Sequence, residues 1–405
     1  MSGENRCSEV SIVGGAYREI CSWPVWDNVF GSGWRAVRVF RVFSPDTNIA
    51  FYSVGDQQLQ QKMKVYASSE PLIPNILASD TTLCFEYKHP LSHPIIKGVN
   101  ENLFSVEANG QYVIGFGMLE ASVKITGKYV VYDPQSPTNP LLFKRQGGSA
   151  DHLALVMNET EARALSDEQD LLKTRDRLFE REGCECLVVK RGAKGAMVFH
   201  SKDDSGYVIP AYKTEHVWPI GSGDVFTTVF AYHWFNGYTP TEAAMKASKA
   251  AAIYCESSGS YEELPQKIQE NYVEINPHKK GIVYLAGPFF TLSEKLFVAE
   301  CRNLLLAMGV KVFSPYHDVG EGKAEDVAPK DIEALDACDC VFAIVDGLDS
   351  GTLFEIGYAV AKRKKVVVYV ENEADGALKM LKGTGCDIQS DFTTAIYKTC
   401  WYASE

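Results

Sequence analysis

The sequence predicts an α/β protein made of two domains, and two observations indicate this class. Apolar, strand-like runs alternate with segments of helical spacing along most of the chain. A polar stretch with two prolines, "GSYEELPQKIQENYVEINPHKKG" at residues 259–281, interrupts that alternation once. Strands that alternate with helices form parallel sheets covered by helices. We therefore predict domains over residues 1–268 and 281–405, joined by a linker over residues 269–280.

The composition agrees with two folded domains and limits the classes of partner. The 405-residue chain is 46% hydrophobic and 23% charged, a globular balance, and its net charge is −12. An acidic chain does not favour nucleic-acid polymers or anionic membranes, and no apolar run approaches the ~20 residues of a membrane helix. Small phosphorylated ligands stay compatible with this charge, because backbone amides can bind them.

The 11 cysteines favour a reducing compartment. Cys184/Cys186 and Cys338/Cys340 form C-x-C pairs inside apolar runs, and no histidine cluster completes a zinc site. We expect free thiols and no metal bound directly by side chains. The start of the chain, "MSGENRCSEVSIVGG", lacks the basic and long apolar regions of a secretory signal, so we expect a cytoplasmic protein.

In the second domain the predicted elements alternate without interruption. Strands are expected at residues 281–287, 310–315, 340–347 and 365–371, with helices at 292–309, at 329–339 and within 346–364. This order predicts a smaller, flavodoxin-like, doubly wound parallel sheet that binds ligands at the carboxyl ends of its strands. Polar residues gather at those ends: Tyr284 and Gly287, His317 and Asp318, and Asp346 and Asp349.

Three carboxylates, those of Asp346, Asp349 and Glu355, lie where the third of these strands passes into a helix. An N-cap and the helix dipole account for one acid, or for two. Glu355 lies further into the helix and borders an apolar stripe, where a carboxylate is costly unless it has a chemical role. This local pattern leaves the structural and the catalytic interpretation equally open.

Three motifs of this domain together resemble the nucleoside 2-deoxyribosyltransferase family. They are "YLAGPFF" at 284–290, "KDIEALDACDCVFAIVDG" at 330–347 and "DSGTLFEIGYA" at 349–359. The resemblance implies cleavage or transfer at an N-glycosidic bond without a cofactor, with Glu355 as nucleophile and Tyr284 orienting it. It implies that Asp331 and Asp349 hold the nucleobase and help to protonate it. It further implies substrate contacts from Gly287, Pro288, Phe289, Asp346 and Gly351.

Structural alternatives accompany these assignments. Tyr284 could be a core aromatic residue, and Asp331 and Asp349 could be helix caps. The motifs are compatible with hydrolysis or transfer, and with nucleosides or 5′-nucleotides as substrates.

The first domain also alternates strands with helices. Strands are expected at residues 8–17, 48–56, 110–118 and 128–134, and residues 153–165 pass from a strand into a helix. Residues 184–200 predict a hairpin across a Gly/Lys turn, and residues 219–237 predict a glycine loop that enters an apolar helix.

Residues 10–265 resemble the pfkB, or ribokinase-like, carbohydrate and nucleoside kinases. "GSGDVF" at 221–226 is similar to the family's glycine-rich signature, and "MNETEA" at 157–162 is similar to its N-x-x-E motif. The resemblance implies a ribokinase-like fold, Mg-ATP as cofactor and Asp224 as general base. It implies an anion hole at Gly221, Ser222 and Gly223, with Asn158 and Glu161 arranging magnesium and phosphate.

The sugar-recognition half departs from that family. Glu19 stands where the family has a sugar-binding Asp, and Val37 stands where its glycine-rich loop has an Asn. We therefore expect the kinase-like domain to act on an unusual substrate, to bind nucleotide without turnover, or to serve as a scaffold.

Together the two resemblances favour an enzyme that processes nucleosides or nucleotides as small-molecule substrates. Because related transferases complete their sites across subunits, we expect at least a homodimer. Two other hypotheses stay open: an active nucleoside or sugar kinase, and a regulatory protein that senses a nucleotide. The intact "GSGD" favours the kinase, whereas Glu19 and Val37 favour the sensor.

Overall fold

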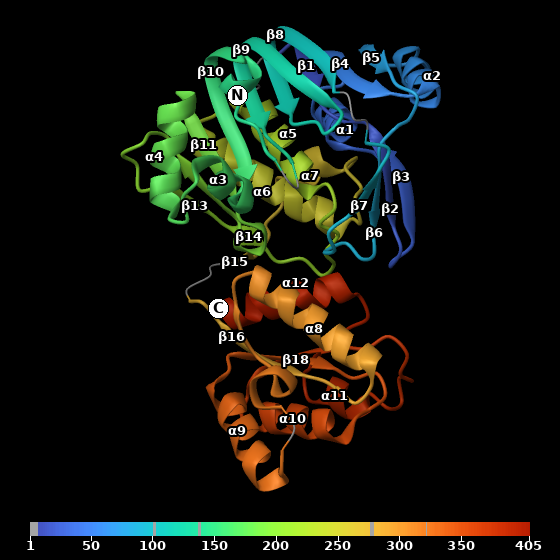
Figure 1. Cartoon of the computed structure of the whole chain (residues 1–405), viewed down its shortest axis with the longest axis vertical. Coiled ribbons are helices and arrows are strands. Elements are labelled where there is room, and N and C mark those ends of the chain that lie inside the picture. The colour runs from blue at the N-terminus through green and yellow to red at the C-terminus, as the bar shows by residue number, and fades with distance from the viewer. Residues whose placement is uncertain (1–6, 100–102, 137–138, 276–278, 321) are drawn as a thin grey trace. The chain divides into compact units, whose positions relative to one another are not determined.

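The computed structural model describes residues 7–99, 103–136, 139–275, 279–320 and 322–405 (Figure 1). The chain divides into two compact units: unit 1 comprises residues 1–214 and 218–274, and unit 2 comprises residues 215–217 and 275–405. The change of unit after Glu274 falls within the segment proposed as a linker, 269–280. Residues 276–278 of that segment lie outside the described residues.

Unit 1 is built on one large sheet in the order β13-β12-β11-β10-β9-β8-β1-β4-β5. Neighbouring strands from β5 to β11 run parallel to one another. Strand β12 runs antiparallel to β11, and β13 runs antiparallel to β12. The strands are β1 (Glu9–Val13), β4 (Asn48–Gly55), β5 (Leu72–Ala78), β8 (Phe104–Phe116), β9 (Ala121–Asp133), β10 (Ser149–Asn158), β11 (Cys186–Lys190), β12 (Ala196–Phe199) and β13 (Tyr207–Ile209). The hairpin predicted at residues 184–200 is confirmed as β11 and β12.

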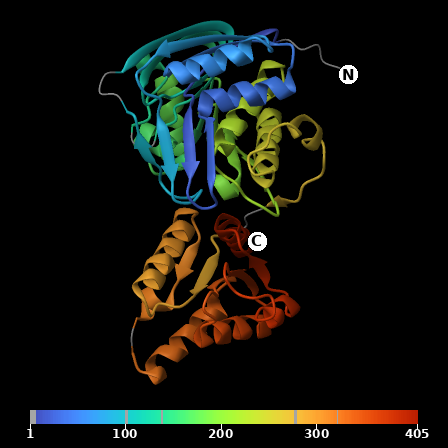
Figure 2. The same cartoon turned by 90° about the vertical axis from the view of Figure 1, so that its right-hand side faces the viewer.

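Helices cover both faces of this sheet (Figures 1 and 2). In β11, Cys186 and Val188 join one core cluster and Leu187 and Val189 join the other, so both faces of the strand are buried. The first cluster contains residues of α1 (Ser32–Phe43), α2 (Gln57–Ala67), α5 (Ser222–Phe235), α6 (Pro240–Glu256) and α7 (Leu264–Lys267). The second contains residues of α3 (Glu159–Ser166) and α4 (Leu171–Glu182).

A second sheet of unit 1 has the strand order β3-β2-β6-β7. Its strands are β2 (Tyr17–Cys21), β3 (Trp26–Phe30), β6 (Cys84–Tyr87) and β7 (Ile95–Lys97). Strand β2 begins four residues after the end of β1, so this small sheet extends from the carboxyl end of β1. Two short strands, β14 (Ala211–Tyr212) and β15 (Glu274–Ile275), complete the strands of the described chain up to residue 275.

Unit 2 contains a parallel sheet in the order β17-β16-β18-β19-β20, which confirms the predicted doubly wound α/β class. Its strands are β16 (Ile282–Ala286), β17 (Lys311–Phe313), β18 (Cys340–Ile344), β19 (Lys365–Tyr369) and β20 (Asp387–Gln389). Its helices are α8 (Leu292–Ala307), α9 (Ala324–Ala337), α10 (Ser350–Ala361), α11 (Lys379–Gly383) and α12 (Phe392–Ser404).

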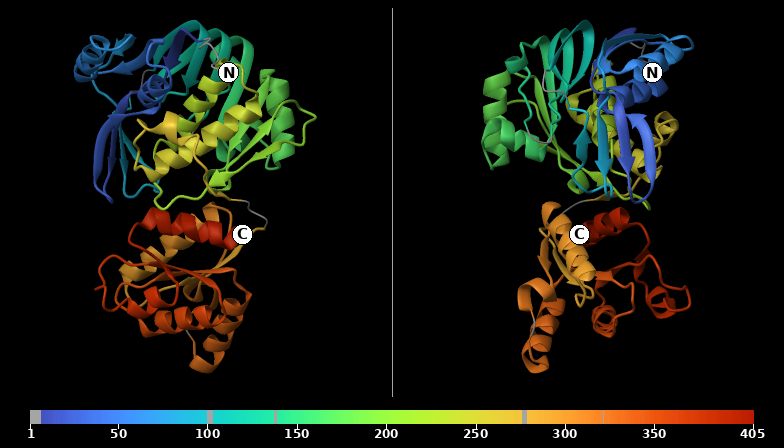
Figure 3. Two further views of the ribbon diagram at one scale, coloured as in Figure 1. Left: turned by 180° about the vertical axis from the view of Figure 1, so that it is seen from behind. Right: turned by 45° about the vertical axis from the view of Figure 1, so that its right-hand side comes forward.

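The helices of unit 2 lie on both faces of its sheet (Figure 3). Helices α9 and α10 pack on one face through Leu335, Ile356 and Ala359, and α8 and α12 cover the other. Helix α9 begins at Ala324, five residues before the start predicted from the sequence. Successive residues of β18 point to opposite faces of the sheet, and all of them are buried under the helices. Polar side chains are therefore accommodated at the carboxyl ends of the strands.

Three further findings concern the described chain as a whole. The 11 cysteines, which all lie in the described ranges, form no disulfide bond, and most of them are buried. In the described ranges, no three His, Cys, Asp or Glu side chains are grouped as the ligands of a metal ion would be. Across the same ranges, every helix is too short or too polar to cross a membrane.

Candidate functional site

In unit 2, a tyrosine and a glutamate from distant parts of the chain meet at the carboxyl end of the sheet. Tyr284 lies in β16, and its hydroxyl donates a hydrogen bond of 2.6 Å to Oε1 of Glu355 in α10. The tyrosine is fully buried, and its ring stacks on Phe313 of β17 with centroids 5.5 Å apart. A buried, stacked donor has little rotational freedom, so this contact fixes the position of the Glu355 carboxylate.

The surroundings of Glu355 favour the protonated form of its own carboxyl group, so this group titrates near neutral pH. Burial raises the pKa of Glu355 from the ordinary 4.5 to about 7. The hydrogen bond from Tyr284 opposes this rise, and the charges of Asp331 and Asp349 add to it. The structure thus brings together the four residues that the sequence nominated for glycosidic chemistry: Tyr284, Asp331, Asp349 and Glu355.

Asp331 lies in α9 with part of its carboxyl group buried. Its Oδ1 is shielded from solvent and has no hydrogen-bond partner among the described residues. Burial raises the pKa of Asp331 above its ordinary value. A buried carboxyl oxygen without a partner is costly unless it is protonated or meets a ligand, so Asp331 is suited to hold and deliver a proton.

Asp349 is the N-cap of α10, as the sequence pattern allows. Its Oδ2 accepts hydrogen bonds from the backbone N–H of Thr352 at 2.8 Å and from the Thr352 hydroxyl at 2.9 Å. A Cβ at Gly351 would lie 3.1 Å from the same oxygen, so glycine at this position leaves room for the carboxylate. Capping therefore orients Asp349, and its charge still acts on Glu355.

The other predicted substrate contacts of unit 2 have different surroundings. Asp346 accepts hydrogen bonds from the backbone N–H groups of Glu371 and Asn372, and so ties the loop after β18 to the loop after β19. Pro288 is buried, and Gly287 lies against Ile344 of β18. Phe289 is half-buried and stacks on Tyr316, an aromatic residue that the sequence motifs do not single out, with centroids 5.5 Å apart.

In unit 1, the two residues predicted to arrange magnesium and phosphate, Asn158 and Glu161, lie at the carboxyl end of β10. Asn158 and Glu161 form a capping box at the start of α3: Asn158 Oδ1 accepts from the Glu161 N–H, and Glu161 Oε2 accepts from the Asn158 N–H. Burial raises the pKa of Glu161 to about 7; the charge of Asp133 adds to the rise, and that of Lys190 opposes it. Asn158 and Glu161 are thus positioned by local helix capping.

Two residues that sequence reasoning missed, the buried Asp133 and the half-buried Lys190, extend this group. Lys190, at the end of β11, donates from Nζ to Oδ2 of Asp133, at the end of β9, over 2.5 Å. The Thr227 hydroxyl donates to the same oxygen at 2.7 Å, whereas Asp133 Oδ1 is buried and has no partner among the described residues. Both residues end strands of the parallel sheet, and that position is the signal by which the sequence could have found them.

The glycine loop begins α5 as predicted. Gly221 is the N-cap of that helix and has φ of +83°, a left-handed conformation that favours glycine. Asp224 lies in the first turn and is buried. Its Oδ2 does not face an open cavity, because Arg35 Nη1 donates to it at 2.6 Å.

Arg35 adds to the two departures predicted in the sugar-recognition half, Glu19 and Val37. Val37 is fully buried in the apolar core beside α1. The side chain of α1 that reaches the glycine loop is Arg35, which binds both Asp224 and Glu19. The predicted site residue Glu19 therefore faces an internal cation.

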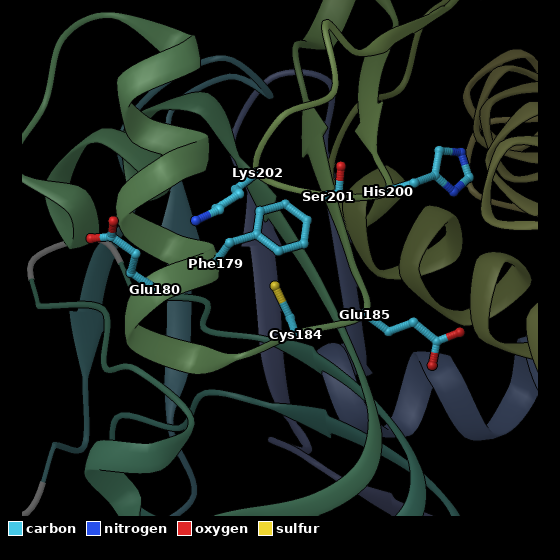
Figure 4. Close-up of a pocket in the computed structure, with 7 residues that line it drawn as sticks. All are labelled: Phe179, Glu180, Cys184, Glu185, His200, Ser201 and Lys202. Atoms are coloured by element: carbon cyan, nitrogen blue, oxygen red, sulfur yellow. The ribbon is translucent and has the colours of Figure 1, made fainter.

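One further hollow of unit 1, of about 550 Å³, is separate from these groups (Figure 4). It is lined by Phe179, Glu180, Cys184, Glu185, His200, Ser201 and Lys202. These residues precede β11 or follow β12, so the hollow lies at the amino end of β11, opposite Lys190. None of the residues predicted for phosphoryl or glycosidic chemistry lines it.

Two family models match the chain, one in each unit. The model described as nucleoside 2-deoxyribosyltransferase matches residues 283–389, and the model described as pfkB family carbohydrate kinase matches residues 121–267. The chain joins a pfkB domain to a nucleoside 2-deoxyribosyltransferase domain. The transferase match contains Tyr284, Asp331, Asp349 and Glu355. The pfkB match contains Asn158, Glu161 and Asp224 and begins after Glu19 and Arg35.

Individual proteins resemble parts of the chain. A 5-dehydro-2-deoxygluconokinase of Listeria innocua is 26% identical over 136 residues, which cover 31% of this chain and 41% of that protein. An uncharacterized protein of Ureaplasma parvum is 34% identical over 106 residues, which cover 22% of this chain and 65% of that protein. The chain thus spans about two fifths of the length of the kinase that it matches.

A solved structure supports the fold of unit 1. A fructokinase double mutant from Vibrio cholerae, with fructose, ADP and potassium bound, has a TM-score of 0.50 and 15% identity to this chain. The match covers 64% of this chain and 96% of the fructokinase. At this identity the likeness establishes a ribokinase-like fold. The support for a role in nucleoside or sugar metabolism comes from the two family models.

Proposed function

We propose that unit 2 cleaves the N-glycosidic bond of a nucleoside or nucleotide and uses Glu355 as the nucleophile. The observation that carries this proposal is the hydrogen bond from buried Tyr284 to Glu355, next to the two acids Asp331 and Asp349. A donor on one carboxylate oxygen orients the other oxygen toward a reacting carbon. The transferase match over residues 283–389 supports the same reaction class.

The reaction proceeds in two balanced steps. An oxygen of ionised Glu355 attacks the anomeric carbon of the sugar, the C–N bond breaks, and a glycosyl ester forms. The leaving base receives the electron pair of that bond and a proton from Asp331. In the second step, water or another base attacks the anomeric carbon of the ester, the bond to Glu355 breaks and the carboxylate is restored. The proton that the incoming water or base loses passes to Asp331, which is then ready for the next cycle. Water gives hydrolysis, and a second base gives transfer.

Asp331 and Asp349 are given different roles because their environments differ. Burial raises the pKa of Asp331, so this carboxyl releases its proton less readily than an exposed aspartate and is the better placed of the two to protonate the departing base. Asp349, held by its capping bonds to Thr352, contributes an oriented carboxylate that contacts the base. The apolar ring of Phe289, stacked on Tyr316, offers a flat face for a planar nucleobase.

Unit 1 is proposed to bind Mg-ATP at the carboxyl ends of β9, β10 and β11. The residues fit this group, because Asp133 has a buried oxygen without a partner in the described chain and Lys190 lies beside it. Lys190 would hold phosphate, and Glu161 and Asp133 would hold the metal or its water shell. Bound Mg-ATP would supply a transferable phosphoryl group. This arrangement favours nucleotide binding as the second function of the chain.

We also propose self-association of the chain. Unit 2 exposes large apolar side chains close in sequence to its site residues, among them Phe290 at 71% and Phe354 at 63% exposure. Exposed apolar groups beside a binding site are typical of surfaces that another protein covers. A second copy of the chain is the partner that the transferase resemblance implies.

The experiment that tests the glycosidic proposal is incubation of the full chain with a panel of nucleosides and 5′-nucleotides, alone and with a second free base. Chromatography would measure released and exchanged base. Glu355→Gln keeps the shape and removes the charge, so product should fall by roughly 10²-fold or more, which corresponds to ~2.7 kcal/mol of lost transition-state stabilisation.

Glu333→Gln is the matched control, since Glu333 is an exposed residue of α9 whose loss should leave the rate unchanged. Near-normal turnover by a folded Glu355→Gln protein would remove Glu355 from the mechanism.

A further inference from the structure

Three buried side chains of unit 1 form an ion cluster where the resemblance places a reacting hydroxyl. Arg35 Nη2 donates to Glu19 Oε2 at 2.6 Å, and its Nη1 donates to Asp224 Oδ2 at 2.6 Å. The three side chains are 1%, 3% and 9% exposed, in the order Arg35, Glu19 and Asp224. Ion pairs shielded from water to this degree are difficult to open, because each charge would lose its partner without gaining water.

The guanidinium of Arg35 is held on every side. Its Nε donates to the Tyr254 hydroxyl at 3.1 Å, and that hydroxyl donates to the Ile220 carbonyl at 3.0 Å. The ring of Phe30 lies 4.8 Å from Cζ, within the range of a cation–π contact. Arg35 is therefore fixed in one position.

Both oxygens of Asp224 are engaged in this arrangement. Oδ2 accepts from Arg35, and Oδ1 accepts from Gln135 Nε2 at 2.5 Å. A general base needs an oxygen within about 2.6–3.2 Å of the hydroxyl whose proton it takes. Each oxygen keeps a second lone pair, so an acceptor molecule would have to share the Asp224 carboxylate with Arg35 and Gln135 and find room beside them.

Arg35 also covers the start of α5. A Cβ placed on Gly221 would lie 2.2 Å from Arg35 Cζ, so the guanidinium packs directly on the backbone of the glycine loop. The side chain thus occupies the space beside both the loop and the base. A sugar hydroxyl would need that same space for in-line attack on a phosphoryl group.

We propose that Arg35 closes the acceptor position of unit 1, so that the unit binds Mg-nucleotide but transfers no phosphoryl group to a sugar or nucleoside hydroxyl. This inference rests on the proposed nucleotide binding and is independent of the reaction at Glu355. Asp224 then acts as a structural partner of Arg35 instead of a general base. Glu19, which binds the second edge of the guanidinium, holds the closed arrangement together.

The test uses the full chain and a double variant, Glu19→Gln with Arg35→Asn. The pair of changes removes one negative and one positive charge, so the net charge of the cluster is unchanged while its space opens. With ATP and magnesium and a panel of nucleosides, pentoses and hexoses, the unaltered chain should form no phosphorylated sugar. The double variant should form ADP roughly 10²-fold faster than the unaltered chain, because water or a hydroxyl then reaches Asp224.

Adding Asp224→Asn to the double variant should return ADP formation to the level of the unaltered chain. If the double variant does not fold, Arg35→Lys keeps a cation with a smaller head group and is measured in the same way. Phosphorylation by the unaltered chain that Asp224→Asn abolishes would overturn the proposal. A folded double variant no faster than the unaltered chain would also overturn it.

Melting temperature supplies a readout that does not depend on turnover. Arg35→Ala should lower the melting temperature by about 10 °C, since a buried ion pair loses one partner, and methylguanidinium should restore part of that loss. Arg38→Ala is the matched control, because Arg38 pairs with Glu70 at a half-exposed position of the same helix and should show a small loss without rescue. If methylguanidinium does not raise the melting temperature of Arg35→Ala, the idea that the guanidinium fills a defined position in the cluster is contradicted.

Stabilisation by ATP separates the two proposals. The unaltered chain and the double variant should both melt at a higher temperature with ATP and magnesium. If neither does, the nucleotide-binding proposal fails and this inference fails with it. If both do and only the acceptor measurements disagree, the closed acceptor position alone is wrong.

Discussion

The hydroxyl of Tyr284 should set the pH dependence of the proposed glycosidic reaction. It donates a hydrogen bond of 2.6 Å to Oε1 of Glu355 and lowers the pKa of that carboxyl against the larger effect of burial, for a resulting pKa of about 7. Tyr284→Phe removes the donor and keeps the buried ring that stacks on Phe313. The ionised form of Glu355 then loses the hydrogen bond from this donor.

The magnitude follows from the strength of a hydrogen bond to a charged group. Such a bond contributes about 1.5–3 kcal/mol, and one pKa unit corresponds to about 1.4 kcal/mol, so the pKa of Glu355 should rise by about 1–2 units. At pH 7 the ionised fraction of Glu355 would fall from about one half to roughly 1–10%, and the rate with it. Above about pH 9 most of the activity should return.

The assay is the initial rate of base release, measured as kcat/KM from pH 5 to pH 10. Tyr358→Phe is the control: Tyr358 is a residue of α10 whose hydroxyl binds the exposed carboxylate of Asp336, and its loss should leave the profile in place. A Tyr284→Phe profile that is lower at every pH, with an unchanged midpoint, would refute the reasoning. It would show that Tyr284 orients Glu355 without affecting its ionisation.

Three further predictions concern the same unit. Because the pKa of Glu355 is higher in the folded chain than its ordinary 4.5, the folded state binds this proton more tightly, and stability should fall as pH rises from 4.5 to about 7. The free energy of unfolding of Glu355→Gln, measured with urea, should therefore exceed that of the unaltered chain by up to about 3 kcal/mol at pH 8. At pH 4 the two free energies should be nearly equal. Equal stability at both pH values would contradict the raised pKa of Glu355. Asp349→Asn keeps an N-cap but removes a charge, so it should lower the midpoint of the pH–rate profile at little cost in stability. Asp349→Ala also removes the cap and should lower the free energy of unfolding by about 1 kcal/mol. A pH–rate profile that does not move in Asp349→Asn would exclude an electrostatic effect of Asp349. Sedimentation at assay concentration should give at least a dimer, and a fully active monomer would contradict the proposed self-association.

Much of the fold could be read from local patterns. The alternation of apolar runs with helical segments indicated parallel sheets in both units, because a strand buried on both faces must be continuously apolar and a covering helix must carry a stripe. The glycine loop before α5 and the acids before α10 were visible for a similar reason, since turns from strand to helix require particular residues at particular offsets. Strands β8 and β9 began earlier than predicted, at Phe104 and Ala121, because their first halves alternate apolar with polar residues and include exposed positions.

The sequence by itself determined which residue types lie at the carboxyl ends of the strands, but only the tertiary structure decided which of them meet. Tyr284 and Glu355 are 71 positions apart, and the order of β16 and β18 in the sheet brings them into contact. Arg35 and Asp224 are 189 positions apart, and the packing of α1 against α5 pairs them. Two positions along a helix rotate a side chain by about 200°, which is why Val37 faces the core while Arg35 faces the glycine loop. A loop motif does not specify that rotation; it is fixed when α1 packs on the sheet.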